Sequence, residues 1–395
     1  MFESAKLLPP DAIFGLTEKF RSDPNDNKIS LTVGVYKDES GNTPLMKAVA
    51  DAEKILAEKN ASKSYLPIDG MPAYNDHIGR MLLGPVADSV KWKSSQTPGG
   101  TGALRVTGEL IKTAIGIDTI WMSKPTWANH PKIFENAGFT VRQHEYLSTE
   151  GVSLDFEAMK KSIADNAKSG EAILLHGACH NPTGVDPTKA QWAELLEVVA
   201  EKKLLPIFDF AYQGFGDGLD EDASAIRDFL ASGKQEAIIC SSFSKNFGLY
   251  GERVGGLTIV TTSDDASAAM QTQVKTIIRR MYSNPPTHGA AIVNTVLSDQ
   301  TLCASWKSEL DEMRERIKKL RTAFVDTMQE VAPGRDFSFI NDQRGMFSYS
   351  GLTDDVADSL MKDHSVYILR SGRINVAGIN DSNRQRLCQA IASVI

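Results

Sequence analysis

Short apolar runs alternate with amphipathic stretches along most of the chain. Residues 119–122, 172–175, 204–208 and 237–240 are apolar runs of the length of a buried strand. Between them, apolar residues recur at spacings of three and four, which is typical of helices that cover a sheet. The pattern predicts successive βαβ units, and therefore an α/β fold with a mostly parallel sheet and helices on both faces.

Local residues mark where several helices begin. Thr188 followed by Gln191 forms a capping box ahead of an amphipathic run. Thr43 before Pro44 places a cap residue ahead of a proline, so we expect a helix from there to about Asn60. The glycine-rich turn at residues 99–102 precedes a further helical stretch.

The last quarter of the chain follows a different pattern. Apolar spacing over residues 304–331 predicts one helix of about 40 Å. Predicted strands at 344–349, 366–370 and 373–376, with helices between and after them, indicate a smaller α+β unit. We therefore divide the chain into an N-terminal arm (1–12), a first part of the small domain (13–45), a large domain (46–305), and a linking helix with the rest of the small domain (306–395).

Composition and charge exclude several classes of function. The 395 residues carry 43 basic and 50 acidic side chains, a formal net charge of −7, without a block of like charge, which argues against a nucleic-acid surface. The four cysteines are far apart, so neither disulfides nor a metal site is expected. No apolar run approaches the roughly 20 residues that cross a bilayer. The first residues also lack the features of a signal peptide, so we expect a cytoplasmic protein without a membrane partner.

Polar residues just after the predicted strands are the best candidates for chemistry, because open α/β sheets bind ligands at the carboxyl ends of their strands. Lys245 follows the strand at 237–240, and Asp209 ends the preceding strand. A desolvated lysine amine can attack a carbonyl, and a carboxylate in such a place needs a cationic partner. The alternative is a structural salt bridge between the two.

The turn at residues 99–102 could bind an anion, because it offers backbone N–H groups at a helix start. Ser242, Ser244 and Arg253 could complete a phosphate site. Taken alone, the turn is better explained as an ordinary tight turn, and Arg253 is equally an exposed surface arginine. The chain contains neither GxGxxG at this turn nor a GxxxxGK[ST] motif.

Five segments together resemble one family. The longest is SFSKNFGLYGERVGG at residues 242–256, and the others are HNPTG at 180–184, DFAYQG at 209–214, YSNPP at 282–286 and SGRINVAG at 371–378. In order and spacing they resemble the class I pyridoxal-phosphate aminotransferases. The chain as a whole resembles the aspartate and aromatic-amino-acid enzymes of bacteria within that family.

The resemblance implies the fold of type I pyridoxal-phosphate enzymes, with pyridoxal 5′-phosphate bound in the large domain. Lys245 would hold the cofactor as a Schiff base and later carry a proton between substrate and cofactor. Asp209 would pair with the protonated pyridine nitrogen. The other implied cofactor ligands are Tyr212 and Asn181 at the phenolic oxygen, Gly100, Thr101, Ser242, Ser244 and Arg253 at the phosphate, Trp127 against the ring, and Tyr65 from a second subunit.

The resemblance also implies how substrate binds. Arg373 would grip the α-carboxylate as a bidentate fork, helped by Asn181 and the backbone of Gly34, with Trp127 lining the site. Arg279 would reach the side-chain carboxylate from the neighbouring subunit, so a homodimer with shared sites is implied. The alternative is a helix end where Arg279 and the adjacent Arg280 are simply exposed.

Three further side chains have implied positions around the ring. Phe347 would wall the site from the smaller domain. His130 and His176 would lie behind the ring, although merely buried histidines are an equal alternative.

Several activities remain open at this point. The first is transfer of an amino group from L-aspartate to 2-oxoglutarate by a ping-pong scheme, giving oxaloacetate and L-glutamate. The second is an aromatic-amino-acid aminotransferase, for which Arg279 must move aside; TPGGTGALR at residues 97–105 looks closer to the aspartate type. A pyridoxal-phosphate lyase or decarboxylase fits the paired arginines less well. A nucleotide-binding α/β protein with a structural Lys245 is a remote alternative.

Overall fold

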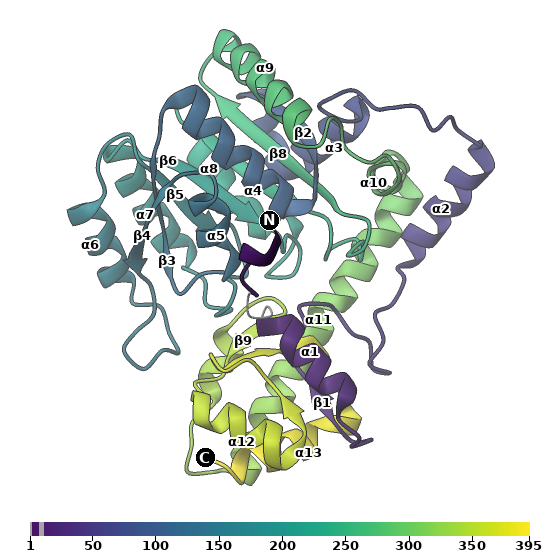
Figure 1. The fold of residues 1–395 in the computed structure, drawn as a ribbon, viewed down its shortest axis with the longest axis vertical. Coiled ribbons are helices and arrows are strands. Elements are labelled where there is room, and N and C mark those ends of the chain that lie inside the picture. The colour runs from purple at the N-terminus through teal and green to yellow at the C-terminus, as the bar shows by residue number, and fades with distance from the viewer. Residues whose placement is uncertain (1, 8–11) are drawn as a thin grey trace.

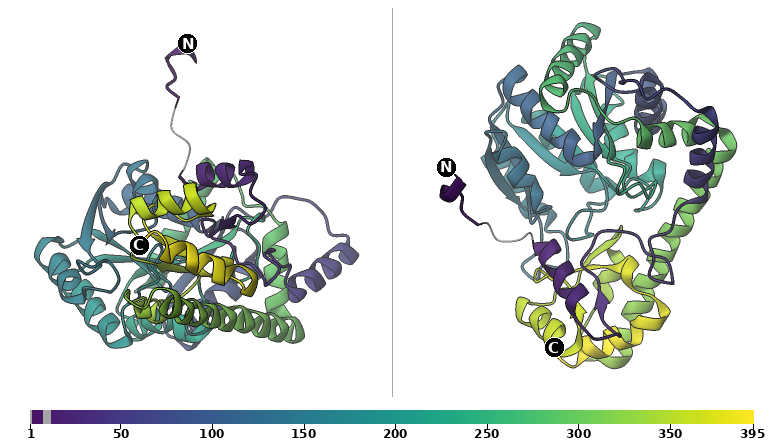
Figure 2. Two further views of the ribbon diagram at one scale, coloured as in Figure 1. Left: turned by 90° about the horizontal axis from the view of Figure 1, so that it is seen from below. Right: turned by 45° about the vertical axis from the view of Figure 1, so that its right-hand side comes forward.

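The computed structural model describes residues 2–7 and 12–395, and for residues 12–14 only the backbone. Figure 1 shows a larger lobe built around one sheet and a smaller lobe below it. The smaller lobe contains α1 near the start of the chain together with the C-terminal helices. Residues 2–7 extend away from both lobes (Figure 2).

The larger lobe contains a seven-stranded sheet with the order β2-β8-β7-β6-β5-β3-β4. Only β8 is antiparallel to its neighbours, so the predicted mostly parallel sheet is confirmed. The strands are β2 (Lys91–Pro98), β3 (Thr119–Lys124), β4 (Thr140–Glu145), β5 (Ala172–His176), β6 (Leu205–Phe210), β7 (Ala237–Ser242) and β8 (Val254–Thr261).

Apolar side chains cover both faces of this sheet. Ile207 and Ile238 belong to one buried cluster, whereas Phe208 and Ile239, one residue further along, belong to another. Successive side chains of a strand point to opposite faces, so a strand buried on both faces reads as a continuous apolar run. The first face is covered by α4 (Gly99–Leu110), α5 (Asn129–Glu135) and α9 (Asp264–Met281), and the second by α6 (Phe156–Asn166), α7 (Lys189–Glu201) and α8 (Leu219–Leu230).

The remaining helices of this lobe are α2 (Lys47–Lys59), α3 (Pro72–Leu83) and α10 (His288–Ser298). The capping box of Thr188 and Gln191 is present at α7. The predicted start of α2 at Thr43 is wrong, because its first free N–H groups are capped by a distant residue. The carboxylate of Glu309 accepts hydrogen bonds from the backbone N–H of Lys47 (2.6 Å) and Ala48 (3.0 Å).

Helix α11 (Gln300–Val331) runs from beside α2 and α10 into the smaller lobe, as Figure 1 shows. It begins four residues before the predicted position, because Asp299 caps its N-terminus through the N–H groups of Thr301 and Leu302. Its buried face, which includes Trp306, Leu310 and Ile317, is the predicted one.

Two small sheets organise the lower lobe. β1 (Ile29–Ser30) pairs in parallel with β10 (Val366–Tyr367), and β9 (Phe347–Tyr349) pairs antiparallel with β11 (Arg373–Asn375). The predicted C-terminal strands are therefore present but shorter. The helices of this lobe are α1 (Ala12–Ser22), α12 (Asp354–His364) and α13 (Asp381–Ala392).

Short helical turns complete the structure. The 3-10 turns are Phe2–Ser4, Gly84–Asp88, Ser338–Asp342 and Val376–Gly378, and a π-helical turn, Ile111–Ile115, ends α4. Within the described residues, every helix is too short or too polar to cross a bilayer.

Candidate active site

A cavity of about 390 Å³ lies at the carboxyl ends of the parallel strands. Asp209 lies near the end of β6, Ser242 ends β7, and Gly100 lies in the first turn of α4, directly after β2. These elements converge because parallel strands present their carboxyl ends at one edge of the sheet. The residues predicted to bind cofactor or substrate all line this cavity except Tyr65 and Arg279, and Phe347 lines it too, whereas His130 and His176 do not.

Lys245 lies in the turn that follows β7, and its side chain is partly buried. Its Nζ is 4.7 Å from the centroid of the Tyr212 ring. Burial lowers the pKa of Lys245 to about 8, although the negative charge of Asp209 opposes the shift. With such a pKa roughly a tenth of the lysine is neutral at pH 7, and this neutral form can act as a nucleophile or accept a proton.

Asp209 is fixed by histidine rather than by lysine. Its Oδ2 lies 3.0 Å from Nε2 of the fully buried His130, whose Nδ1 lies 2.8 Å from the Thr126 hydroxyl. Burial alone would raise the pKa of Asp209, but the hydrogen bond to His130 and the nearby positive charges hold it below its usual value. A structural salt bridge between Asp209 and Lys245 is not found among the described residues.

Two more histidines continue behind Asp209. The His176 ring lies 5.1 Å from the His130 ring and 4.1 Å from the His180 ring. Burial lowers the pKa of His176 to about 3, so this ring is neutral. Nitrogen or oxygen atoms of His130, His176 and Asp209 lie within 4.8 Å of one another and could in principle approach a metal ion. Because Asp209 already hydrogen-bonds His130, the absence of a metal stays our prediction.

The residues predicted to hold a phosphate surround one end of the cavity. The hydroxyls of Ser242 and Ser244 lie 3.2 Å apart, and Nη1 of Arg253 donates to the Ser244 hydroxyl at 3.3 Å. The backbone of Gly99 has a φ of +73°, and a Cβ there would lie 2.4 Å from Nη2 of Arg253. A helix start, two hydroxyls and a guanidinium are the donor set that a phosphate monoester requires, so these residues fit the cofactor's phosphate.

Arg373 lies at the other side of the cavity, in β11. Its Nη1 is 3.5 Å from Oδ1 of Asn181, and its guanidinium lies 4.1 Å from the centroid of the Phe347 ring. The side chain is only 3% exposed, and burial lowers its pKa to about 10. Its Nε is buried without a hydrogen-bond partner in the described part of the chain. A buried guanidinium with a free donor can receive a carboxylate.

Gly34 approaches the site from the segment before α2. A Cβ at this position would lie 2.7 Å from Cζ of Phe347, so only glycine lets the backbone come this close to the ring. Trp127 is partly buried on the same cavity, and its indole contacts the His130 ring edge-on at 5.2 Å.

Tyr65 and Arg279 lie elsewhere on the molecule. Tyr65 is 92% exposed and lines an open hollow of about 460 Å³, together with Tyr282 and Ser283. Arg279 is exposed at the end of α9, where it donates to the Ser283 hydroxyl at 2.5 Å. The two residues therefore occupy neighbouring positions on one exposed surface, and neither enters the cavity of its own chain.

The sequence interpretation gave no role to two residues that matter here. Tyr250 lines the cavity, and its hydroxyl accepts a hydrogen bond from the backbone N–H of Tyr36 at 2.8 Å. Tyr250 lies three residues before Arg253 in the longest motif, and this position could have suggested a place in the site. Thr126 orients His130, and it is one residue before Trp127 in the sequence.

Comparisons with known proteins agree with this geometry. The family model described as aminotransferase class I and II matches residues 26–391. The chain is 49% identical to an aspartate aminotransferase of Haemophilus influenzae and 41% identical to an aromatic-amino-acid aminotransferase of Escherichia coli, with all of both chains covered each time. A crystal structure of an aromatic-amino-acid aminotransferase from Burkholderia pseudomallei, covalently bound to pyridoxal phosphate, superposes with a TM-score of 0.96 at 44% identity, over 100% of this chain and 99% of that one.

Proposed function

The chain belongs to the class I and II aminotransferase family, and from this premise we propose that it transfers the amino group of L-aspartate to 2-oxoglutarate, giving oxaloacetate and L-glutamate. One observation carries the proposal: the partly buried amine of Lys245 and the buried guanidinium of Arg373 line the same cavity. An amine that can be neutral and a cation without a carboxylate partner suit a carbonyl reagent and an acidic substrate.

Pyridoxal 5′-phosphate is the cofactor that we propose for this cavity. When bound, it supplies an aldehyde that condenses with amines and a protonated ring that withdraws electrons from the substrate α-carbon. The Ser242, Ser244 and Arg253 cluster would hold its phosphate with the first turn of α4. Asp209, kept ionised by His130, would keep a ring nitrogen protonated, and Trp127 would cover one face of the ring.

Lys245 would perform the proton transfer. Its Nζ, free once substrate is bound, would accept the proton from the substrate α-carbon. It would then donate a proton to the cofactor. Tyr212 lies against this amine and, together with Asn181, would hydrogen-bond the phenolic oxygen of the cofactor. The pKa of the Tyr212 hydroxyl is raised well above its usual value by burial, so this group stays a donor.

Arg373 would hold the α-carboxylate of every substrate, with Asn181 and the backbone of Gly34 beside it. We propose that Arg279 of a second copy of the chain binds the distal carboxylate and that Tyr65 of that copy reaches the phosphate. Their shared exposed surface supports a homodimer, because both residues lie together and outside their own cavity.

The division of the chain and its location belong to the same proposal. Residues 46–305 would form the cofactor-binding domain, and 13–45 with 306–395 the small domain and its linking helix. Residues 1–12 would be an N-terminal arm, of which residues 1 and 8–11 lie outside the described residues. We keep the cytoplasm as the expected location.

A second candidate is an aromatic-amino-acid aminotransferase. Trp127, Tyr212 and Phe347 give the cavity aromatic walls, and aromatic-amino-acid enzymes are among the relatives and solved structures at 41–44% identity. Measuring transamination rates on aspartate and phenylalanine side by side separates the two, because only a preference for aspartate agrees with our proposal.

Visible spectroscopy and chemical labelling test the cofactor and its attachment. The purified protein should absorb in the visible range, and aspartate should convert that band to one at shorter wavelength. Borohydride reduction followed by peptide mapping should place the label on Lys245, and Lys245→Ala should retain cofactor yet turn over negligibly. A label on another lysine, or normal turnover of the variant, would refute the assignment.

A further inference from the structure

Residues 31–46 join β1 to α2 without forming a helix or a strand. Gly34, which lines the cavity, lies within this segment. A segment of this length without regular structure lacks the repeated backbone hydrogen bonds that would fix it. Among the described residues, backbone hydrogen bonds fix only its start, where Leu31 pairs with Tyr367 and Asn375, and a local turn at residues 38–42. The remaining hydrogen bonds that position the segment involve side chains.

The half of the segment around Gly34 is held by β11. The side-chain amide of Asn375 donates to the carbonyls of Val33 (2.7 Å) and Val35 (2.8 Å), which flank Gly34 on both sides. Nη2 of Arg373 donates to the carbonyl of Thr32. The residue proposed to bind the α-carboxylate is thus tied directly to this segment.

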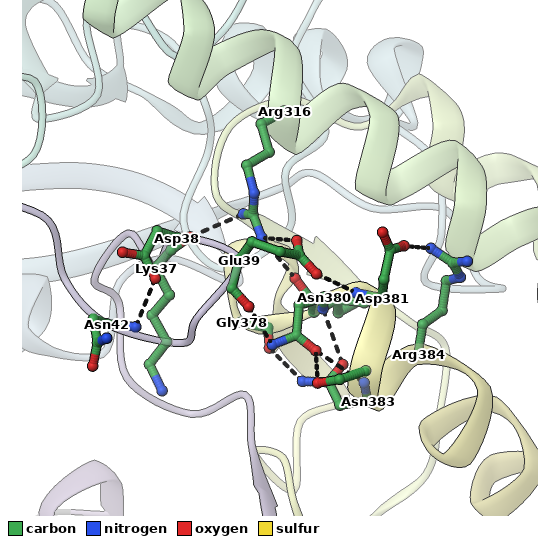
Figure 3. A network of polar contacts seen from close by, with 12 residues as sticks. Lys37, Asp38, Glu39, Asn42, Arg316, Gly378, Asn380, Asp381, Asn383 and Arg384 are labelled. Atoms are coloured by element: carbon green, nitrogen blue, oxygen red, sulfur yellow. Dashed lines mark hydrogen bonds and ion pairs between the residues drawn. The ribbon is translucent and has the colours of Figure 1, made fainter.

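The other half is held by Arg316, which extends from α11 as Figure 3 shows. Its Nη1 donates to the carbonyl of Lys37 at 2.9 Å, and its Nη2 pairs with Oε2 of Glu39 at 3.0 Å. Nη2 also lies 3.4 Å from the carbonyl of Ile379. One guanidinium therefore joins the segment, α11 and the turn before α13.

Glu39 fixes the same turn from the other side. Its Oε1 accepts a hydrogen bond from the backbone N–H of Asp381, the first residue of α13, at 2.7 Å. Its backbone carbonyl accepts from the side chain of Asn380 at 3.1 Å. A carboxylate at a helix N-terminus is further stabilised by the helix dipole. Figure 3 shows these contacts as one connected network.

The middle of the segment also contacts the larger lobe. The N–H of Tyr36 donates to the hydroxyl of Tyr250, which lines the cavity. The Tyr36 ring lies 5.8 Å from the Arg316 guanidinium carbon. Arg316 is therefore connected to the cavity through two residues, although its own side chain does not line it.

We propose that Arg316 is a positioning residue for substrate binding, acting with Glu39 to fix the segment that carries Gly34. The inference rests on the proposed function of the site. With the segment held in place, its conformational entropy is lost on folding rather than on binding of substrate. Without Arg316, each binding event must order the segment again, so substrate affinity falls while the chemical step is retained.

The test uses the holoenzyme and four variants. Arg316→Ala should raise KM for both the amino acid and the oxo acid about tenfold, roughly the loss of one charge-assisted hydrogen bond, and should leave kcat within about twofold. Backbone amides of residues 33–40 should exchange hydrogen faster without any substrate present. Arg316→Lys should recover part of both effects, because lysine retains the charge but not the fork.

Arg384→Ala is the matched control. Arg384 belongs to the network of Figure 3 and pairs with Asp381 at 2.6 Å, but makes no hydrogen bond or ion pair with residues 31–46 in the described structure. It should leave KM and exchange unchanged. Glu39→Gln gives a second variant that removes only a charge, in case Arg316→Ala folds poorly, and should show the same changes in smaller degree.

The outcomes separate this inference from the proposed function. Unchanged exchange in both Arg316→Ala and Glu39→Gln would overturn it, as would a loss of kcat at constant KM. Binding of succinate, a dicarboxylate without a group to transfer, can be titrated by calorimetry even if the enzyme proves to catalyse another reaction. If the wild-type protein shows no transamination, the proposed function is contradicted. If Arg316→Ala nevertheless binds succinate more weakly than the wild type, the positioning role is supported.

Discussion

Arg373 shows how one residue can combine a structural and a functional contact. One guanidinium nitrogen holds the carbonyl of Thr32, another approaches Asn181, and the Nε proton has no partner in the described part of the protein. A buried cation is costly unless it is paired. The position is therefore stabilised most when a carboxylate is bound.

Arg373→Lys should lower kcat/KM about a hundredfold for every amino and oxo acid, because an ammonium cannot provide two parallel donors. Steady-state kinetics on aspartate and 2-oxoglutarate measure the effect. Arg370→Lys is the control, because Arg370 is exposed and pairs with Asp354 and Asp358 on the surface. A near-normal rate for Arg373→Lys would place the α-carboxylate elsewhere.

The buried His144 makes stability depend on pH. Burial lowers its pKa to about 4, whereas an unfolded histidine titrates near 6.5. Between these values the unfolded chain binds a proton at His144 and the folded chain does not. The titration of His144 therefore costs no stability above pH 6.5, and it lowers the free energy of unfolding as the pH drops towards 4.

His144→Gln should remove up to about 3 kcal/mol of this loss between pH 6.5 and 4, by the relation of about 1.4 kcal/mol per pKa unit. Urea denaturation across this range measures it as the difference between variant and wild type. His288→Gln, at an exposed site, is the control for replacing a histidine by glutamine. Parallel pH profiles for wild type and His144→Gln would contradict the assignment.

At the scale of elements, the sequence predicted β3, β5, β6 and β7 from their apolar runs and missed β2, β4 and β8. β2 and β4 are the two edge strands of the sheet and contain many polar residues, so they show no apolar run. β8 is interior but includes Gly255, whose backbone lies against Gly99. The start of α2 depends on Glu309, a residue more than 250 positions away, which no local pattern could reveal.

Gly99 shows how the start of an element shapes the cavity. Alanine there would be strained at a φ of +73° and would also collide with the Arg253 guanidinium at 2.4 Å. We expect Gly99→Ala to bind the cofactor about tenfold more weakly, measured by its release on dialysis, through loss of one charged contact.

Gly116→Ala separates strain from collision. Gly116 has a φ of +83°, but a Cβ there would meet nothing within 4 Å. This variant should lose stability without losing cofactor. Equal cofactor loss in the two variants would mean that backbone strain, not the displaced Arg253, is responsible.

For the whole molecule, the sequence indicated the edge of the sheet where the cavity lies, because Asp209, Ser242 and Lys245 lie at or just after strand ends. Phe347 and Arg373, at the starts of β9 and β11, could not be found by that rule. The sequence also could not locate Tyr65 and Arg279 from periodicity or composition, because exposed residues at a helix end or in a loop look like ordinary surface. Their roles were implied only by the family resemblance. Neither residue enters the cavity of its own chain, so these roles require a second copy.

Mixed dimers test the sharing of sites. Lys245→Ala and Arg279→Leu should each be nearly inactive on aspartate alone. When the two are refolded together, half of the dimers are hybrids with one intact site each, so roughly a quarter of wild-type activity should return. A mixture of Lys245→Ala with Arg373→Lys should recover nothing, because those two residues lie in one chain's cavity. Recovery in neither mixture would remove Arg279 from the partner's site.

The parallel pairing of Ile29 with Val366 has a consequence for how the chain acquires its structure during synthesis. The partner of this early strand is synthesised 337 residues later (366 − 29). Closing so long a loop is entropically unfavourable, but the cost grows only logarithmically with its length. The large sheet can assemble while translation continues, whereas the segment that carries Gly34 must await the emergence of β10 from the ribosome. Nascent chains stalled before residue 366 should therefore leave residues 31–42 open to protease even when the central sheet is protected.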